Sequence, residues 1–254
     1  MKKVLGTYQL LCADYYDLHK PVLPDDEWEF YLRYAQEAQG PLLEPMCGTG
    51  HFLIPLTQRG FQIEGFDASE AMLARLRTRA KQENLSVNVW LGFLEDLTIT
   101  NRYKLAFISV GSFNLISKLD AVTISLKALY NALLPGGLLV LELMTYTLAC
   151  HLPINEWIYA EYEREDKKKI AIKTLYRPVV NGGVEVVRRY ALITEQEQTE
   201  RVEIEEYELR FYDTDQIQQF LQKAGFSQVR VIKAFDHVML PSKGDHIVIY
   251  ECKK

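Results

Sequence analysis

The sequence predicts an α/β fold in which a mostly parallel sheet carries helices on both faces and an antiparallel β meander is inserted late in the chain. Between residues 41 and 143, short apolar runs alternate with segments of helical period, a pattern typical of consecutive βαβ units. Residues 151–212 lose the helical period, and β-branched and aromatic residues there alternate with charges. Two more apolar runs follow a last helical segment, so we expect the sheet to end in an antiparallel hairpin.

Five strands are expected in the first part of the chain, over residues 42–46, 61–66, 87–91, 104–110 and 137–144. Two of the linking helices have N-cap candidates, Ser69 and Asp120, whose side chains can accept a hydrogen bond from the first helical turn. Residues 135–137, Pro-Gly-Gly, stop the second of these helices and lead into the fifth strand. Pro55 is tolerated if it lies in the first turns of a helix that begins near Thr49 or Gly50.

The late block predicts four antiparallel strands, over residues 157–164, 169–179, 184–194 and 201–211. Residues 181–183, Asn-Gly-Gly, fit a hairpin turn between the second and the third. In the fourth, Val202 and Ile204 keep one phase of the alternation while Tyr207 and Leu209 keep the other, which predicts a β-bulge at residues 205–206. A helix over 213–224 and strands over 227–234 and 246–252 complete the chain. The expected units are residues 1–150 together with 213–254, and an inserted subdomain of residues 151–212.

Composition narrows the class of protein. The chain has 254 residues, 48% hydrophobic and 25% charged, which suits one soluble globular domain with an ample core. A formal net charge of -5, with acids concentrated in residues 195–208, disfavours nucleic acid as a partner. The four cysteines are widely spaced, so neither a metal site nor a disulfide framework is expected. Without a signal peptide or an apolar run of membrane-spanning length, the protein is predicted to be cytoplasmic and to enter no membrane.

Two features indicate a nucleotide site at the ends of the first two strands. Residues 42–50, Leu-Leu-Glu-Pro-Met-Cys-Gly-Thr-Gly, form a buried strand that leads into a turn with Gly48 and Gly50, and glycine lets a ligand approach the main chain closely. Asp67 follows the second apolar run and is placed to accept hydrogen bonds from a ribose diol. Capping of the next helix is the alternative role for Asp67, but Ser69 already occupies that position.

Three segments occur in the order and at the spacing of motifs in the class I S-adenosylmethionine-dependent methyltransferases: residues 44–50, residues 64–69 followed by Met72, and residues 133–137, Leu-Leu-Pro-Gly-Gly. The chain resembles this family over nearly its whole length. The late insertion and residues 13–17, Ala-Asp-Tyr-Tyr-Asp, resemble its small-molecule branch, which includes glycine, sarcosine and amino-sugar N-methyltransferases.

The resemblance implies a Rossmann-like sheet of seven strands, S-adenosylmethionine as cofactor and a small-molecule acceptor. It also implies that the insertion covers the acceptor pocket. Because insertions of this kind often mediate oligomer contacts, a homodimer through residues 151–212 stays open.

The resemblance further implies a set of cofactor-binding residues: Glu44, Met46, Cys47, Gly48, Gly50, Asp67, Ala68, Met72, Phe93, Leu94 and Ser109. The glycine turn would hold the methionyl and ribose parts, Asp67 the ribose hydroxyls, and Met72 or Phe93 the adenine faces. Glu44 would orient the cofactor's ammonium or, alternatively, cap the following turn. Phe93 departs from the family, which often has an acid there for the adenine amino group, unless Glu95 or Asp96 supplies that contact.

Methyl transfer depends mainly on positioning, so neither a strong acid nor a metal is required. The candidates for a catalytic role are Tyr16, Asn114 and Tyr146. Asn114 could bind the acceptor or the methionine carboxylate, with loop capping as the alternative. Tyr16 and Tyr146 could join Trp28 and Tyr31 in an aromatic lid, with core packing as the alternative. No histidine has a spacing that marks a base, and Cys47 lacks a partner histidine that would make it a nucleophile.

The predicted function is methyl transfer from S-adenosylmethionine to nitrogen or oxygen of a small-molecule acceptor. A nicotinamide-dependent dehydrogenase is disfavoured, because its fingerprint requires a third glycine where this chain has Leu53. A non-catalytic cofactor-binding protein of the same fold stays open. So does a methyltransferase acting on RNA or protein, although the acidic balance and the missing N/D-P-P-Y/F motif after the fourth strand disfavour RNA.

Overall fold

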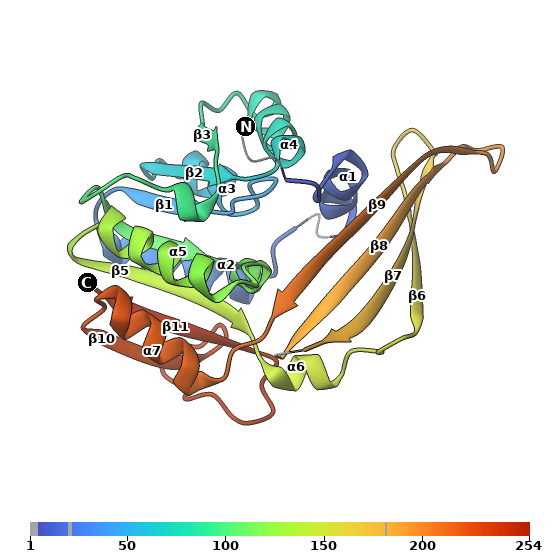
Figure 1. The fold of residues 1–254 in the computed structure, drawn as a ribbon. Helices are drawn as coiled ribbons and strands as arrows, with labels where there is room; N and C mark the ends of the chain where they lie inside the picture. Colours follow the sequence, from blue (N-terminus) through green and yellow to red (C-terminus); the bar gives the residue numbers. More distant parts are fainter. Residues whose placement is uncertain (1–4, 20–21, 181) are drawn as a thin grey trace.

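The computed structural model describes residues 5–19, 22–180 and 182–254, which form two separate sheets with helices around them (Figure 1). The larger sheet has seven strands in the order β10 (Gln228–Lys233), β11 (Ile247–Lys253), β5 (Leu133–Met144), β4 (Tyr103–Ile108), β1 (Leu42–Pro45), β2 (Ile63–Asp67) and β3 (Asn88–Leu91). Strands β1 to β5 run parallel to one another, whereas β11 is antiparallel to both β5 and β10. The predicted mostly parallel sheet with its terminal antiparallel hairpin is confirmed.

Helices cover both faces of the larger sheet: α5 (Leu119–Ala132) and α7 (Thr214–Ala224) on one face, and α2 (Asp25–Ala38), α3 (Leu53–Gln58) and α4 (Glu70–Gln82) on the other. Leu43 belongs to the core beneath α5 and α7, and its neighbour Leu42 belongs to the core beneath the other three helices. The central strands are buried on both faces, which is why they are continuous apolar runs in the sequence. Helix α2 precedes β1 and was not predicted.

Some of the predicted helix boundaries are found and others are not. The Ser69 side chain accepts a hydrogen bond from the Met72 N–H at 3.1 Å, so Ser69 is the N-cap of α4. Helix α3 begins at Leu53, later than the predicted start near Thr49 or Gly50, so Pro55 is its third residue and lies in the first turn, where its missing N–H costs little. Asp120 is a correction: α5 begins earlier, with Lys118 at the N-cap position, so Asp120 lies inside the first turn. Strand β5 likewise begins at Leu133, and the Pro-Gly-Gly segment forms an irregularity within it.

The second sheet is the predicted antiparallel meander, with strands β6 (Trp157–Glu163), β7 (Lys169–Val179), β8 (Gly183–Ile193) and β9 (Thr199–Arg210) in sequence order. Each strand is antiparallel to the next. Asn181 of the predicted hairpin turn lies outside the described residues, and Gly182 has a φ of +80°, in the left-handed region that turns require. The division of the chain into two units stays a prediction, although all four strands lie within residues 151–212.

The predicted β-bulge at residues 205–206 is wrong. Pairing between β8 and β9 continues through both residues, and the register shifts instead beside Leu192. Glu203 and Glu205 are buried and lie on the same face of the sheet as Tyr207. Val202 and Ile204 lie on the other face and are 41% and 54% exposed. The alternation is therefore continuous, but with acids on the inner face and aliphatic residues outside.

The buried acids hold a helix against the meander. Helix α1 (Leu10–His19) begins where Gln9 N–H donates to the Glu205 carboxylate at 2.7 Å and Leu11 N–H donates to the Glu203 carboxylate at 2.8 Å. The first N–H groups of a helix lack partners within it, and the positive end of its dipole favours carboxylates. The two acids thus replace the side-chain cap that the sequence of α1 does not provide.

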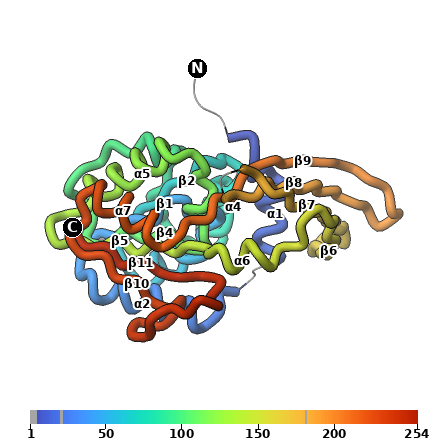
Figure 2. The backbone as a smooth tube through the Cα atoms, turned by 60° about the horizontal axis from the view of Figure 1, so that its bottom comes forward, coloured from blue at the N-terminus to red at the C-terminus, as the bar shows by residue number. Residues whose placement is uncertain are grey.

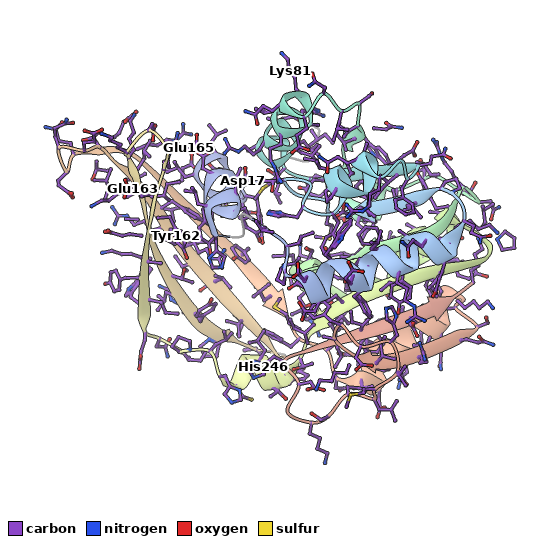
Figure 3. All side chains as sticks on the ribbon, turned by 180° about the vertical axis from the view of Figure 1, so that it is seen from behind. Asp17, Lys81, Tyr162, Glu163, Glu165 and His246 are labelled. Carbon is purple, nitrogen blue, oxygen red and sulfur yellow. The ribbon has the colours of Figure 1, made fainter. Side chains whose placement is uncertain are left out.

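Helix α1 lies between the meander and the larger sheet (Figure 2). Its Asp17 forms an ion pair of 2.5 Å with Arg75 of α4, and its Asp14 forms one of 2.5 Å with Arg164 after β6. Figure 3 shows Asp17 between α4, which carries Lys81, and β6, which carries Tyr162. The short helix α6 (Tyr146–Cys150) leads from β5 into the meander. These contacts hold α1 beside the carboxyl ends of the central strands.

In the described part of the chain, no helix combines the length and the apolar character that a membrane crossing needs. No group of three or more His, Cys, Asp or Glu side chains that could hold a metal ion occurs among the same residues. The four cysteines are free thiols, and Cys150 is the exposed one.

Candidate active site

A cavity of about 450 Å³ lies between the meander and the edge of the larger sheet at which the parallel strands end. This volume is within the range of small-molecule sites. Most of the predicted cofactor residues line it: Met46, Gly48, Asp67, Ala68, Met72, Phe93 and Leu94. Four others lie behind its wall: Glu44, Cys47, Gly50 and Ser109.

The glycine turn and Asp67 meet directly. Because β1 and β2 are parallel neighbours, with Pro45 opposite Phe66, the turn after β1 lies beside the end of β2. Gly48 N–H donates to Asp67 Oδ2 at 2.9 Å, and Ser69 N–H donates to Oδ1 at 2.8 Å. Burial raises the pKa of Asp67, and these N–H groups oppose the shift. A carboxylate has about four lone-pair sites, so Asp67 can still accept hydrogen bonds from a ligand.

The two glycines have different roles. Gly48 has a φ of +52° and lines the cavity, and a Cβ added there would meet no atom within 4 Å. Gly50 has a φ of +83° and lies behind the wall, where an added Cβ would be 2.7 Å from Leu76 Cγ. Gly48 therefore leaves the main chain open to a ligand, while Gly50 lets the turn pack against α4.

Glu44 takes the capping position. It is 4% exposed, and its carboxylate accepts a hydrogen bond from the N–H of Leu53, the first residue of α3. Burial raises its pKa well above the usual range, and the nearby Asp67 adds to the shift. Its Oε2 atom is buried and has no hydrogen-bond partner among the described residues. A contact between Glu44 and the cofactor's ammonium stays a prediction.

Cys47 and Ser109 are also buried, at 5% and 9% exposure. Burial raises the pKa of the Cys47 thiol well above its usual range, with the carboxyls of Glu44 and Asp67 adding to the shift. A thiol that stays protonated is a poor nucleophile. The Ser109 carbonyl accepts a hydrogen bond from the Ser112 N–H, which closes the turn after β4.

The wall that follows β3 contains both Phe93 and an acid. Phe93 lines the cavity, and so does Glu95 in the short 3₁₀ helix η1 (Leu94–Asp96), whereas Asp96 does not. Of the two acids considered in the sequence, Glu95 is thus the one at the cavity.

Comparison with known proteins agrees with this geometry. Residues 42–137 match the family model described as a methyltransferase domain. A protein of Geobacillus sp. strain WCH70, whose name assigns it provisionally to the methyltransferases, is 23% identical over 247 residues, or 95% of this chain and 98% of the relative. The chain therefore carries a methyltransferase domain over residues 42–137.

Solved structures share the fold of this methyltransferase. An S-adenosylmethionine-dependent methyltransferase from Clostridium acetobutylicum superimposes with a TM-score of 0.79 at 19% identity, over 95% of this chain and 96% of that one. The sugar N-methyltransferase KedS8 from Streptoalloteichus sp. superimposes with a TM-score of 0.74 at 16% identity, over 98% of this chain and 94% of that one.

The residues that line the cavity suit S-adenosylmethionine as the cofactor of such a domain. When bound, the cofactor supplies a methyl group on a sulfonium, which departs from it to leave a neutral thioether. The open main chain at Gly48 and the remaining acceptor sites of Asp67 match the polar groups of a nucleoside, and Met72 and Phe93 offer apolar surface for its base.

On the other side of the cavity, the wall of the methyltransferase comes from residues that carry no motif. Tyr8, Arg188, Tyr207 and Leu209 line it, and none of them was predicted. Tyr8 is tied to the motif residue Ser69, whose hydroxyl donates to the Tyr8 carbonyl at 2.6 Å. For Arg188 one signal was present: it occupies the phase of β8 that is otherwise apolar, between Val186 and Tyr190.

The three catalytic candidates have different surroundings. Tyr16 lines the cavity, and burial raises its pKa to about 12. Asn114 is fully buried, and its amide donates to the carbonyls of Met144 and Arg210 and accepts from the Met144 N–H. Tyr146 is 40% exposed on α6 and does not line the cavity.

The other members of the expected aromatic lid lie in the core or near it. The Tyr31 hydroxyl donates to the buried Glu142 at 2.8 Å, and its ring packs on Phe52. The Arg59 guanidinium lies 4.5 Å from the ring centroid of Trp28. Within the described residues, no histidine lines the cavity.

Proposed function

We propose that this methyltransferase transfers the methyl group to nitrogen or oxygen of a small molecule held between the larger sheet and the meander. The observation that carries the proposal is a single cavity lined both by Gly48 and Asp67 and by Arg188 and Tyr207. A donor and an acceptor bound in one cavity are held in contact, which is the main requirement of an in-line methyl transfer. The likeness in fold to KedS8, named as a sugar N-methyltransferase, supports a small acceptor.

The side chains at the acceptor end position the acceptor and do not take its proton. Burial raises the pKa of Tyr8 well above its usual range and that of Tyr16 to about 12, so both hydroxyls stay protonated near neutral pH. A protonated phenol donates or accepts a hydrogen bond but is not a base. An amine acceptor therefore reacts from its neutral form and releases its proton to water.

The cofactor part of the proposal is tested by calorimetry with S-adenosylhomocysteine, the demethylated cofactor. We expect micromolar binding that Asp67→Ala weakens about tenfold or more, roughly 1.4 kcal/mol. Equal binding by the wild-type protein and the variant would contradict the site. Tight binding of a nicotinamide dinucleotide instead would favour the dehydrogenase interpretation.

The acceptor part is tested by incubating the protein with S-adenosylmethionine that carries a labelled methyl group and with fractions of small metabolites, RNA and protein. We expect label in a small-molecule fraction, and none when heat-inactivated protein is used. Label in RNA or protein would favour the macromolecular alternative. Cofactor binding without transfer to any fraction would favour a non-catalytic protein.

We also propose a homodimer through the outer face of the meander. Tyr159 and Ile204 lie in one row across the sheet, through the paired residues Lys173 and Arg189, and are 64% and 54% exposed. Exposed apolar side chains on one sheet face are typical of an interface. Sedimentation analysis should show a dimer that Ile204→Glu dissociates, and a monomer at all concentrations would contradict it.

A further inference from the structure

Arg188 is a cation at the cavity that forms no ion pair with an acid of the described residues. It is partly buried on β8 and lines the cavity, and among the described residues it forms neither an ion pair nor a hydrogen bond. Its guanidinium carbon lies 5.9 Å from the ring centroids of both Tyr15 and Tyr207. By contrast, Arg75 and Arg164, on the other side of α1, are paired with aspartates.

The carboxylates nearest to this region have other partners. Glu205 lies directly opposite Arg188 in the pairing of β8 with β9, but its carboxylate accepts the Gln9 N–H and forms no ion pair with Arg188. Burial raises the pKa of Glu205, and the Gln9 N–H and the charge of Arg188 only partly oppose the shift. The two acids of the cavity wall, Asp67 and Glu95, come from the larger sheet and from η1, and neither is within ion-pair distance of Arg188. A guanidinium partly removed from water costs free energy unless its donors are satisfied, so the arrangement favours a ligand that brings an anion.

We infer that Arg188 binds a carboxylate of the acceptor, with the hydroxyls of Tyr8, Tyr16 and Tyr207 as further donors. This inference rests on the proposed function, and it narrows the acceptor to a small carboxylic acid that also carries the nitrogen or oxygen to be methylated. The planar guanidinium presents paired N–H donors that match a carboxylate.

A phosphate group fits this wall less well. The second cation of the cavity wall is Lys118, an exposed residue at the N-cap of α5 on the sheet side. Among the residues that the structure describes, Arg188 is therefore the one that supplies positive charge on the meander side, among neutral phenols. One fixed charge balances a carboxylate monoanion and leaves a phosphate dianion with excess charge.

The inference is tested on the protein saturated with S-adenosylhomocysteine, by calorimetric titration with monocarboxylates of increasing size, acetate, benzoate and indole-3-acetate, and with their amides. Phenyl phosphate is titrated in parallel. The variants are Arg188→Gln and the matched control Arg189→Gln, because Arg189 is the next residue of β8 and is exposed on the opposite face. Tyr207→Phe removes one hydroxyl and keeps the ring, so it serves as a second variant if Arg188→Gln fails to fold.

We expect at least one carboxylate to bind the wild-type protein saturably, and to bind about tenfold more tightly than its amide. Arg188→Gln should weaken the carboxylate about tenfold and Tyr207→Phe roughly threefold, while Arg189→Gln leaves it unchanged. The inference is overturned if no carboxylate binds, if the amide binds equally well, if both cavity variants bind like the wild type, or if phenyl phosphate binds more tightly than every carboxylate.

Failure of this inference can be separated from failure of the proposed function. Binding of S-adenosylhomocysteine is measured for every variant before the second titration. If it binds and the label is transferred to a neutral small molecule, the proposed function stands and the role of Arg188 is rejected. If it does not bind the wild-type protein, the proposed function itself is rejected.

Discussion

On the sheet side of the cavity the turn after β1 exposes main chain at Gly48, whereas the wall on the meander side is formed by long side chains. Gly48 and the carboxylate of Asp67, which main-chain N–H groups hold in place, form the first wall. Tyr16, Arg188 and Tyr207 form the second. A main-chain site depends on strand ends and on glycine at fixed places, so the fold itself sets which cofactor binds. Single side chains of the other wall can be substituted without changing the strands that carry them. We therefore expect differences in acceptor specificity to arise from substitutions that leave the fold intact.

The largest effect on stability is expected for a substitution at Asn114, which connects these two regions. The Asn114 amide connects the turn after β4 with the ends of β5 and β9 through three hydrogen bonds. Asn114→Ala leaves buried main-chain groups without partners, and we expect it to lower the free energy of unfolding by about 3 kcal/mol. Urea unfolding checks this, with Ser112→Ala as the control, because the Ser112 hydroxyl makes no hydrogen bond within the described residues. Lost methyl transfer at unchanged stability would instead give Asn114 a chemical role.

A pair of substitutions in the glycine turn separates packing from binding on the sheet side. Gly50→Ala should cost about 2 kcal/mol of stability, from left-handed strain and from overlap with Leu76. Gly48→Ala should cost about 1 kcal/mol, from strain alone, but place a methyl group in the cavity and weaken S-adenosylhomocysteine about tenfold. Both variants are measured by urea unfolding and by calorimetry. Equal effects of the two substitutions on the binding of S-adenosylhomocysteine would show that the cofactor does not contact the main chain at Gly48.

On the meander side, two substitutions at neighbouring residues test the finding that β9 buries acids and exposes aliphatic residues. Glu205→Ala removes the acceptor for the Gln9 N–H at the start of α1, and we expect a loss of about 1.5 kcal/mol in stability. Glu206→Ala, one residue further on the exposed face, should change stability by less than about 0.5 kcal/mol. Equal losses in urea unfolding would show that the acids of this strand act through their charge alone and not through capping of α1.

The same contrast explains what could be predicted from the sequence. The parallel strands, the glycine turn and Asp67 were predicted because a doubly covered strand must be apolar and the turn after it needs glycine. The phase of β9 was predicted wrongly, because alternation normally indicates which side chains are buried, and here Glu203 and Glu205 are buried to cap a helix distant in the sequence. Arg188 and Tyr8 could not be assigned to the cavity from the sequence, because the residues that surround them come from other elements. No spacing between residues along the chain indicates that these elements lie together.

The smallest effect separates the two roles of Glu44. Its pKa is raised, so the folded protein holds the proton more tightly than the unfolded chain does. Between the usual carboxyl pKa and the raised one, stability therefore falls as pH rises, and it is regained when the pH falls back through that window. Glu44→Gln keeps an acceptor for the Leu53 N–H and removes the titrating group, so we expect stability at neutral pH to change by less than about 1 kcal/mol and this pH dependence to disappear.

Binding of S-adenosylhomocysteine by the same variant then decides the role. If Glu44 only caps α3, the affinity of Glu44→Gln stays within about twofold of the wild type at neutral pH. If the buried Oε2 atom also accepts a hydrogen bond from the ligand's ammonium, that cation favours the ionised carboxylate in the complex, and Glu44→Gln weakens binding about tenfold because hydrogen bonds between charged groups are the stronger ones. Titration with the analogue that lacks the amino group is the control: it should bind the wild type and the variant equally in either case, and a difference would mean that the substitution has disturbed the glycine turn itself.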